Sequence, residues 1–249
     1  VGTGVAGEGG CNISLGTSGT LFISSQKFKV DRHNALHAFA HADGGYHLMG
    51  CILSAASCNK WLMEDIFRTE DYAAEQAGIT EEMLGRNHVY FLPYLMGERS
   101  PINDTNARGT FIGMTMDTTR SDLVQAVLEG VAFAIRDSFE VARSLGLDIP
   151  STKICGGGSK SPLWRTIFAN VLGIPLELLK TEQGPGYGGA MLAMVGCGRY
   201  ESVQVAADAL VEVADRVEPD PELTARYEAR YQQFRKIYPA LKQVFPQLL

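Results

Sequence analysis

Two short stretches rich in glycine and hydroxyl residues are the parts of this sequence best suited to hold a phosphorylated ligand. The first is LGTSG at positions 15–19, and the second, from Ile154 to Arg165, reads ICGGGSKSPLWR. Glycine lets a ligand come close to the backbone, and free N–H and hydroxyl groups bind phosphate oxygens. The second stretch is not a P-loop, because that motif has a glycine directly before its lysine and Ser159 stands before Lys160 here.

Each stretch is expected at the end of a β-strand. The sequence NISLGTSGTLFISS predicts two strands joined by a tight turn, a hairpin whose tip carries backbone donors and hydroxyls. The segment ICGGG leaves a predicted strand, and Ser161 and Pro162 are suited to cap and begin a helix. Either stretch can also be an ordinary turn without a ligand, so the spelling alone leaves both interpretations open.

The rest of the chain alternates between strand and helix patterns. Apolar residues recur near helical spacing over 48–67, short surface helices are suggested over 68–84, and 88–95 is typical of a buried strand. The clearest pattern predicts a strand, a turn and a helix over 108–146, with Ser121 as the N-cap and Gly146 as the stop.

Further alternation follows towards the C-terminus. The predicted elements are a strand at 152–157, a helix at 162–173, a strand at 175–179, a helix at 187–198 and a polar C-terminal helix that buries its aromatic residues. Strands alternating with helices predict an α/β domain on a mostly parallel sheet, with the early hairpin as its antiparallel edge.

Composition favours a small-molecule ligand. The chain has 249 residues, 45% of them hydrophobic and 20% charged, as is typical of a soluble globular protein. A net charge of -6 without a basic run argues against nucleic acid or an anionic membrane surface as a partner. No apolar run approaches a membrane span, and no signal peptide is apparent.

The cysteines predict the cellular compartment, and the first residues predict that the sequence is part of a longer protein. Five cysteines without a C-x-x-C pair indicate neither a disulfide framework nor a zinc knuckle, which fits a reducing cytoplasm. The opening VGTGVAGEGG lacks an initiator methionine and is more typical of a connection inside a longer protein, so we expect a missing upstream part.

Three other features could suggest a functional site, and each also has a structural interpretation. The GTGVAG at 2–7 spells a dinucleotide fingerprint but follows no strand. The histidines at 33, 37 and 41 have metal-ligand spacing on a helix, but ALHAFAH alternates like a strand. Glu98 and Arg99 can either reach an active-site cleft or pair with neighbours to shape a loop, and the sequence leaves both open.

Several long motifs resemble the FGGY family of carbohydrate kinases. The stretch GTFIGMTMDTTRSDLVQAVLE, from Gly109 to Glu129, is similar to the second signature of that family at every constrained position. SLGTSGTLF resembles its second phosphate motif, and ICGGGSKSPLWRTIFANVLG resembles its adenosine motif. LPYLMGERSP, MGCILSAASCNKWL, EQGPGYGGAMLAMVGCGRY and the end of the chain look like the D-xylulose-specific members.

The resemblance implies an actin-like, ribonuclease-H-like α/β fold with a mixed sheet flanked by helices. In that family two domains close over ATP and sugar, and residues 1–249 correspond to the C-terminal, nucleotide-binding domain. The first phosphate motif, most sugar contacts and the aspartate that accepts the sugar proton belong to the N-terminal domain. The resemblance therefore carries no catalytic base and no metal ligand into this chain.

The resemblance also implies which residues contact the nucleotide. Gly16, Thr17 and Ser18 would bind the terminal phosphates of ATP, and Gly109 and Thr110 would lie along the phosphate chain. Adenosine would be held by Gly156, Gly157, Gly158 and Ser159. Mg²⁺ would bridge the phosphates, through ligands and waters of the other half.

Three functions follow as hypotheses. The first is ATP-dependent phosphorylation of D-xylulose to D-xylulose 5-phosphate, to which this chain, inactive alone, supplies the nucleotide-binding half. The second is the same chemistry on gluconate, ribulose or another sugar, and the third is a non-catalytic nucleotide-binding module. Homodimerisation is common among related kinases, but no residue stripe assigns an interface.

Overall fold

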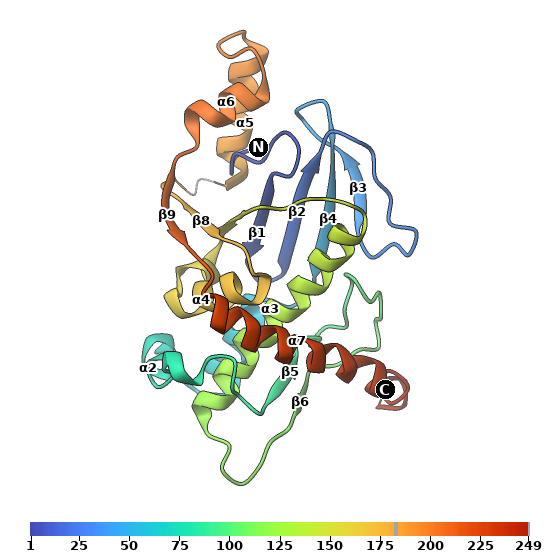
Figure 1. The fold of residues 1–249 in the computed structure, drawn as a ribbon, viewed down its shortest axis with the longest axis vertical. Helices are drawn as coiled ribbons and strands as arrows, with labels where there is room; N and C mark the ends of the chain where they lie inside the picture. Colours follow the sequence, from blue (N-terminus) through green and yellow to red (C-terminus); the bar gives the residue numbers. More distant parts are fainter. Residues whose placement is uncertain (182–183, 249) are drawn as a thin grey trace.

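A seven-stranded mixed sheet forms the centre of the computed structural model, which describes residues 1–181 and 184–248 (Figure 1). Glu182 and Gln183, which open one of the family-like stretches, lie outside the described residues. The strands are β1 (Cys11–Leu15), β2 (Gly19–Ser25), β3 (His37–Ala40), β4 (Tyr46–Ile52), β7 (Thr152–Cys155), β8 (Leu176–Leu179) and β9 (Val213–Val217). Their order in the sheet is β3-β4-β2-β1-β7-β8-β9.

The direction of the strands corrects part of the sequence prediction. Only the pairs β1–β7 and β7–β8 are parallel, and the other four pairs are antiparallel. The hairpin β1–β2 forms as predicted, but it lies in the middle of the sheet and not at an edge. The prediction of a mostly parallel sheet was wrong because β3, β4 and β9 each join as antiparallel strands, whereas the mixed sheet flanked by helices is confirmed.

The long helix α3 (Arg120–Ser144) crosses one face of the sheet and is buried along most of its length (Figure 1). Its N-cap is Thr119 and not Ser121 as predicted. The Thr119 hydroxyl accepts the N–H of Asp122, and the Asp122 carboxylate accepts the N–H of Thr119 at 2.8 Å. This reciprocal capping box satisfies two free donors of the first turn, which a cap at Ser121 would leave open.

A second helical layer packs on α3. Helix α4 (Pro162–Leu172) begins at the predicted cap Ser161 and packs against α3. Helix α7 (Pro221–Leu241) packs on both α3 and α4 and buries its aromatic side chains, as predicted for the C-terminal helix. One continuous core joins the sheet to these three helices.

A group of short elements lies beyond one end of the sheet (Figure 1). It contains α1 (Ala56–Lys60), a π-helix (Trp61–Phe67), α2 (Tyr72–Ala77) and the two-stranded sheet of β5 (Tyr90–Leu92) and β6 (Thr110–Ile112). The helical prediction over 48–67 was wrong in its first part, because residues 48–52 belong to strand β4. These residues pair with β2 along their whole length, so sheet pairing overrides the helical spacing.

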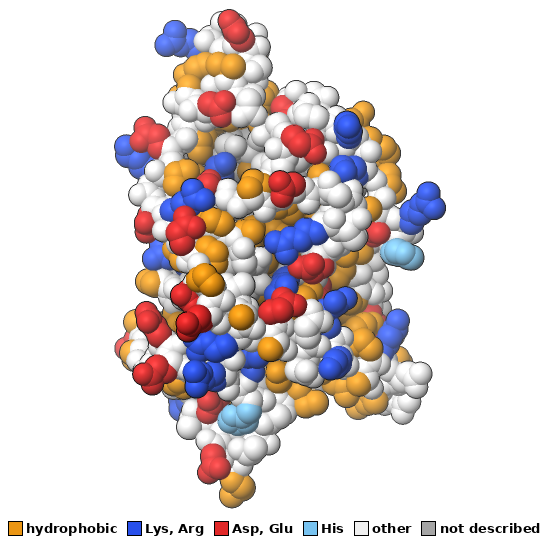
Figure 2. All heavy atoms as spheres, in the orientation of Figure 1, with side chains coloured by type: hydrophobic (Ala, Val, Ile, Leu, Met, Phe, Trp, Pro, Cys, Tyr) orange, Lys and Arg blue, Asp and Glu red, His pale blue; other side chains and the backbone are white. Residues whose placement is uncertain are grey.

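Helices α5 (Gly184–Gly196) and α6 (Val203–Leu210) pair at the opposite end of the molecule and have a small apolar cluster of their own (Figure 1). Helix α6 and strand β9 were not predicted from the sequence. On the face drawn in Figure 2, acidic and basic side chains intermingle over the surface. Within 1–181 and 184–248, no helix combines the length and the apolar character needed to cross a membrane.

Candidate nucleotide site

The tip of the β1–β2 hairpin is held through its carbonyl groups, while two of its N–H groups are free. The Gly16 carbonyl accepts the N–H of Ala56, and the Thr17 carbonyl accepts the N–H of Ala55, both at 2.9 Å. The Ser57 hydroxyl also donates to the Thr17 carbonyl, at 2.7 Å. Among the described residues, the N–H groups of Thr17 and Ser18 donate to no protein acceptor. The tip therefore presents two unused donors, as an anion-binding turn does.

The second glycine-rich turn lies beside this tip because β1 and β7 are parallel neighbours. Gly156 follows β7 with φ of +92°, and a Cβ atom there would stand 2.7 Å from the Leu15 carbonyl oxygen. Both the backbone conformation and the space thus require glycine at this position. The buried Ser159 hydroxyl donates to the Gly156 carbonyl at 2.7 Å and closes the short 3₁₀ turn over 157–160.

A cavity of about 680 Å³ opens between the two turns. It brings together three of the predicted site residues, Thr17, Gly157 and Gly158. Lys60 and Lys160 contribute positive charge, and none of its lining residues is a carboxylate. Its size falls within the usual range for ligand pockets of about 300–1,000 Å³. A cavity with free N–H donors, cationic side chains and no acidic side chain favours an anionic ligand of nucleotide size.

The opposite wall consists of residues that the motifs did not indicate. Helix α2 contributes Tyr72 and Gln76, and α1 contributes Asn59. The Gln76 Oε1 atom accepts the Ser161 hydroxyl at 2.7 Å, which ties α2 to the first turn of α4. Within the described part of the chain, the buried Asn59 Oδ1 atom has no hydrogen-bond partner. No local sequence signal marks these side chains, because α2 reaches the cavity only through tertiary packing.

The other predicted site residues lie outside the lining of this cavity. Ser159 is buried beneath its turn, and Gly156 faces a neighbouring cavity of about 210 Å³. Gly109 and Thr110 lie at the start of β6, where Thr110 pairs with Leu92 of β5. Gly16 and Ser18 of the hairpin tip do not line the cavity either, and the roles of all nine predicted residues in nucleotide binding stay predictions.

Glu98 and Arg99 shape a loop beside the end of β4. The Glu98 Oε1 atom accepts the N–H groups of Leu53 at 2.9 Å and of Arg99 at 2.7 Å. Burial raises the pKa of the Glu98 carboxyl to about 8, although these two hydrogen bonds oppose the shift. The Arg99 Nε atom donates to the His37 imidazole at 3.4 Å. These contacts fit the loop-shaping alternative, while the buried Glu98 Oε2 atom has no hydrogen-bond partner among the described residues, so both alternatives stay open.

Similarity to known proteins assigns this chain to a family. The model of the FGGY family of carbohydrate kinases, C-terminal domain, matches residues 11–197. This chain belongs to that family. The match includes both glycine-rich turns and the whole of α3, so it covers the elements that build the cavity.

Individual members of the family extend the similarity to nearly the whole chain. A xylulose kinase of Staphylococcus epidermidis is 32% identical over 100% of this chain, and a xylulose kinase of Escherichia coli is 34% identical over 97%. Among solved structures, a "xyloylose kinase" from Brucella ovis is 36% identical over 98% of the chain, with a TM-score of 0.90. This chain covers 50% of that structure, and it spans about half the length of the curated relatives it matches. The structural similarity confirms the predicted actin-like fold.

Proposed function

We propose that this chain is the C-terminal, nucleotide-binding half of an ATP-dependent D-xylulose kinase, which forms D-xylulose 5-phosphate and ADP. The observation that carries the proposal is that relatives called xylulose kinase match nearly the whole chain at 32% and 34% identity. The cavity between the two glycine-rich turns supports the nucleotide part of the proposal, since its donors and lysines suit an anionic ligand.

Each turn has a separate part in the proposed binding mode. The free N–H groups of Thr17 and Ser18 would bind the terminal phosphates, where they would stabilise the charge on the transferred phosphoryl group. Gly157 and Gly158 would lie against adenosine, facing α2 across the cavity. Gly109 and Thr110 would lie along the phosphates in the assembled enzyme.

Mg²⁺ in such enzymes neutralises phosphate charge and orients the reacting groups. In the described ranges, no group of three His, Cys, Asp or Glu side chains is placed to hold a metal ion. The ion would arrive with the nucleotide, since Mg²⁺ is usually bound through substrate phosphates and one or two carboxylates.

The sugar and its proton acceptor would be supplied by an N-terminal domain of the same protein. Closure of the two domains would exclude water and align the sugar hydroxyl with the γ-phosphate, which limits wasteful ATP hydrolysis. We place this reaction in the cytoplasm, where thiols stay reduced, as are all five cysteines here. A homodimer of the complete kinase belongs to the same proposal.

The test compares this chain with the full-length protein. We expect the 249-residue chain to bind ATP but to make no sugar-dependent ADP, with mass spectrometry excluding a co-purified N-terminal piece. The full-length protein is expected to turn over fastest with D-xylulose in a panel that includes gluconate and ribulose. Faster turnover of another sugar would overturn the substrate assignment, and failure of the chain to bind ATP would overturn the site.

A further inference from the structure

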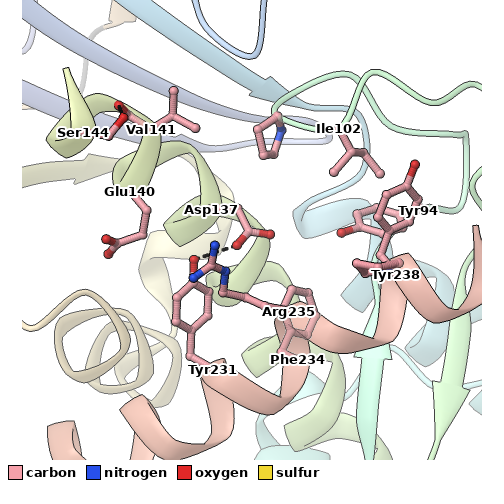
Figure 3. Close-up of a pocket in the computed structure, with 12 residues that line it drawn as sticks. Tyr94, Ile102, Asp137, Glu140, Val141, Ser144, Tyr231, Phe234, Arg235 and Tyr238 are labelled. Atoms are coloured by element: carbon pink, nitrogen blue, oxygen red, sulfur yellow. Dashed lines mark hydrogen bonds between the residues drawn. The ribbon is translucent and has the colours of Figure 1, made fainter. Parts of the chain in front are cut away.

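A second cavity, of about 390 Å³, lies between the C-terminal half of α3, the C-terminal half of α7 and the loop around Ile102 (Figure 3). It shares no lining residue with the nucleotide cavity. Part of its lining comes from two of the family-like stretches, LPYLMGERSP and the end of the chain, but no ligand was assigned to either of them. The proposed kinase reaction makes no use of this cavity.

Four of the twelve residues that line this cavity are aromatic. Tyr231, Phe234 and Tyr238 come from successive turns of α7, and their rings line one side (Figure 3). Two of them are fixed by hydrogen bonds: the Tyr231 hydroxyl donates to Asp137 Oδ1 at 2.6 Å, and the Tyr238 hydroxyl donates to Asp104 Oδ2 at 2.8 Å. The aromatic surface is therefore held in place without a ligand.

The cavity contains both a hydrogen-bond acceptor and a cationic donor that the described residues do not use. Asp137 uses one carboxylate oxygen for Tyr231, and within the described part of the chain its second oxygen accepts no hydrogen bond. Arg235 lies one turn after Tyr231 on α7, and its guanidinium stands 5.7 Å from the centre of the Tyr231 ring. Among the described residues it makes no ion pair and no hydrogen bond. Glu140, by contrast, is already engaged by Arg136 and Arg143. One acceptor and one cationic donor thus remain available.

Pro239 adds a backbone acceptor at the same place. It lies inside α7 and lines the cavity. Since proline has no N–H, it cannot make the helical hydrogen bond to the carbonyl of Arg235, four residues earlier. That carbonyl is left without its usual donor on the turn of α7 that borders the cavity.

We propose that this cavity binds an uncharged polyhydroxylated molecule of pentose or hexose size. Hydroxyl groups both donate and accept, so one such molecule can satisfy Asp137 and Arg235 together. The partly exposed side chains of Ile102, Val141 and Tyr238 can contact its C–H surface. A simple anion would meet the Asp137 and Glu140 carboxylates, and a simple cation would meet Arg235. The volume is near the lower end of the range for small-ligand pockets, about 300 Å³ and above.

The proposal can be tested on the 249-residue chain by calorimetry and ligand-observed NMR, with xylitol and D-xylose as probes. We expect saturable binding in the millimolar range. Asp137→Asn keeps the side-chain shape and the acceptor for Tyr231, and Arg235→Gln alters an exposed residue, so both variants are expected to fold. Each should weaken binding by about fivefold or more.

Arg199→Gln serves as the matched control, because Arg199 is also exposed and lies after α5, outside this cavity. It is expected to bind both probes like the unaltered chain. Binding of D-xylose alone would identify a ring sugar as the ligand, and binding of xylitol alone would identify an open-chain polyol. Absence of saturable binding, equal binding by all three variants, or stronger competition by inorganic phosphate would overturn the proposal.

Discussion

The proposed nucleotide cavity and the cavity between α3 and α7 are built from different groups. The nucleotide cavity lies where strands end, and its donors are mostly backbone groups of turns that glycine makes possible. The cavity between α3 and α7 lies between helix faces, and its groups are side chains of aromatic residues, Asp137 and Arg235. A site made of backbone groups can be recognised in the sequence by its glycines. A site made of side chains on a helix cannot, because its residues have the same apolar spacing as those of an ordinary core helix.

The largest effect on stability is expected from the loss of the ion pair that joins α7 to α3. The buried Arg230 guanidinium pairs with the Glu129 carboxylate at 2.6 Å. Arg230→Met would leave that carboxylate buried without its partner, so we expect the free energy of unfolding to fall by about 3–5 kcal/mol. Chemical denaturation measures this loss, with Arg226→Met as the control because Arg226 bonds only a carbonyl oxygen.

The same variant separates the two cavities. Helix α7 walls the second cavity and contributes nothing to the lining of the first. Under conditions where Arg230→Met is folded, its ATP affinity should therefore stay within about twofold of the original. A large loss of ATP affinity in the folded variant would mean that the two regions are not independent.

Filling the nucleotide cavity should have the next largest effect. A Cβ atom at Gly157 would meet no other atom within 4 Å, so Gly157→Leu extends into the cavity without a clash. We expect ATP binding to weaken by about a hundredfold, close to 2.7 kcal/mol, with little change in Tm. Gly189→Leu is the matched control, since Gly189 is equally open but lies on α5. Equal ATP affinity in both variants would place the nucleotide elsewhere.

The pH dependence of the free energy of unfolding should reveal the buried Asp137 carboxyl of the cavity between α3 and α7. Burial raises the pKa of the Asp137 carboxyl to about 6, against the hydrogen bond from Tyr231 and the charges of Arg235 and Arg136, while the Glu140 charge adds to the shift. Between pH 4 and 6 the unfolded chain releases this proton before the folded chain does, so the Asp137 contribution to stability falls as the pH rises.

Asp137→Asn removes that titration while keeping the acceptor for Tyr231. Relative to the original chain, the variant should gain about 2–3 kcal/mol of stability between pH 4 and 7. Denaturation at a series of pH values measures the difference. A difference that does not change with pH would show that Asp137 ionises normally in the folded chain.

The smallest expected effect concerns the charge at the mouth of the nucleotide cavity. Lys160 lines the cavity and is exposed to solvent. Lys160→Met should weaken ATP binding only about two- to threefold at low salt, and this difference should vanish at high salt because exposed charges are screened. Lys180→Met, an exposed lysine outside the cavity, should change nothing. A salt-independent loss would mean that Lys160 contacts the nucleotide directly.

Local patterns predicted the elements that local interactions determine. The hairpin at 16–19, the helix that begins at Ser161 and the buried aromatic face of α7 all depend on residues close in sequence. The N-cap of α3 could also have been predicted, because Thr119 and Asp122 have the spacing of a capping box. The prediction of Ser121 overlooked this spacing.

Long-range pairing could not be predicted in the same way. Strand β1 pairs with β7 across about 140 residues, and nothing in either segment specifies the partner or its direction. The α2 wall of the nucleotide cavity could not be predicted for the same reason, because Gln76 contacts Ser161 only after both helices have packed. The free pair of Asp137 and Arg235 was hidden for a different reason, because it lies on helices that the sequence marks only as amphipathic.

The hairpin tip has a consequence for the thermodynamics of ATP binding. Ala55, Ala56 and Ser57 already hold the carbonyl groups of Gly16 and Thr17, so under the proposed binding mode the tip would have its ligand-binding shape before a ligand arrives. Little conformational entropy is then lost at this turn when phosphate binds. The interaction energy of the terminal phosphates stays available for drawing the rest of the enzyme closed around its substrates.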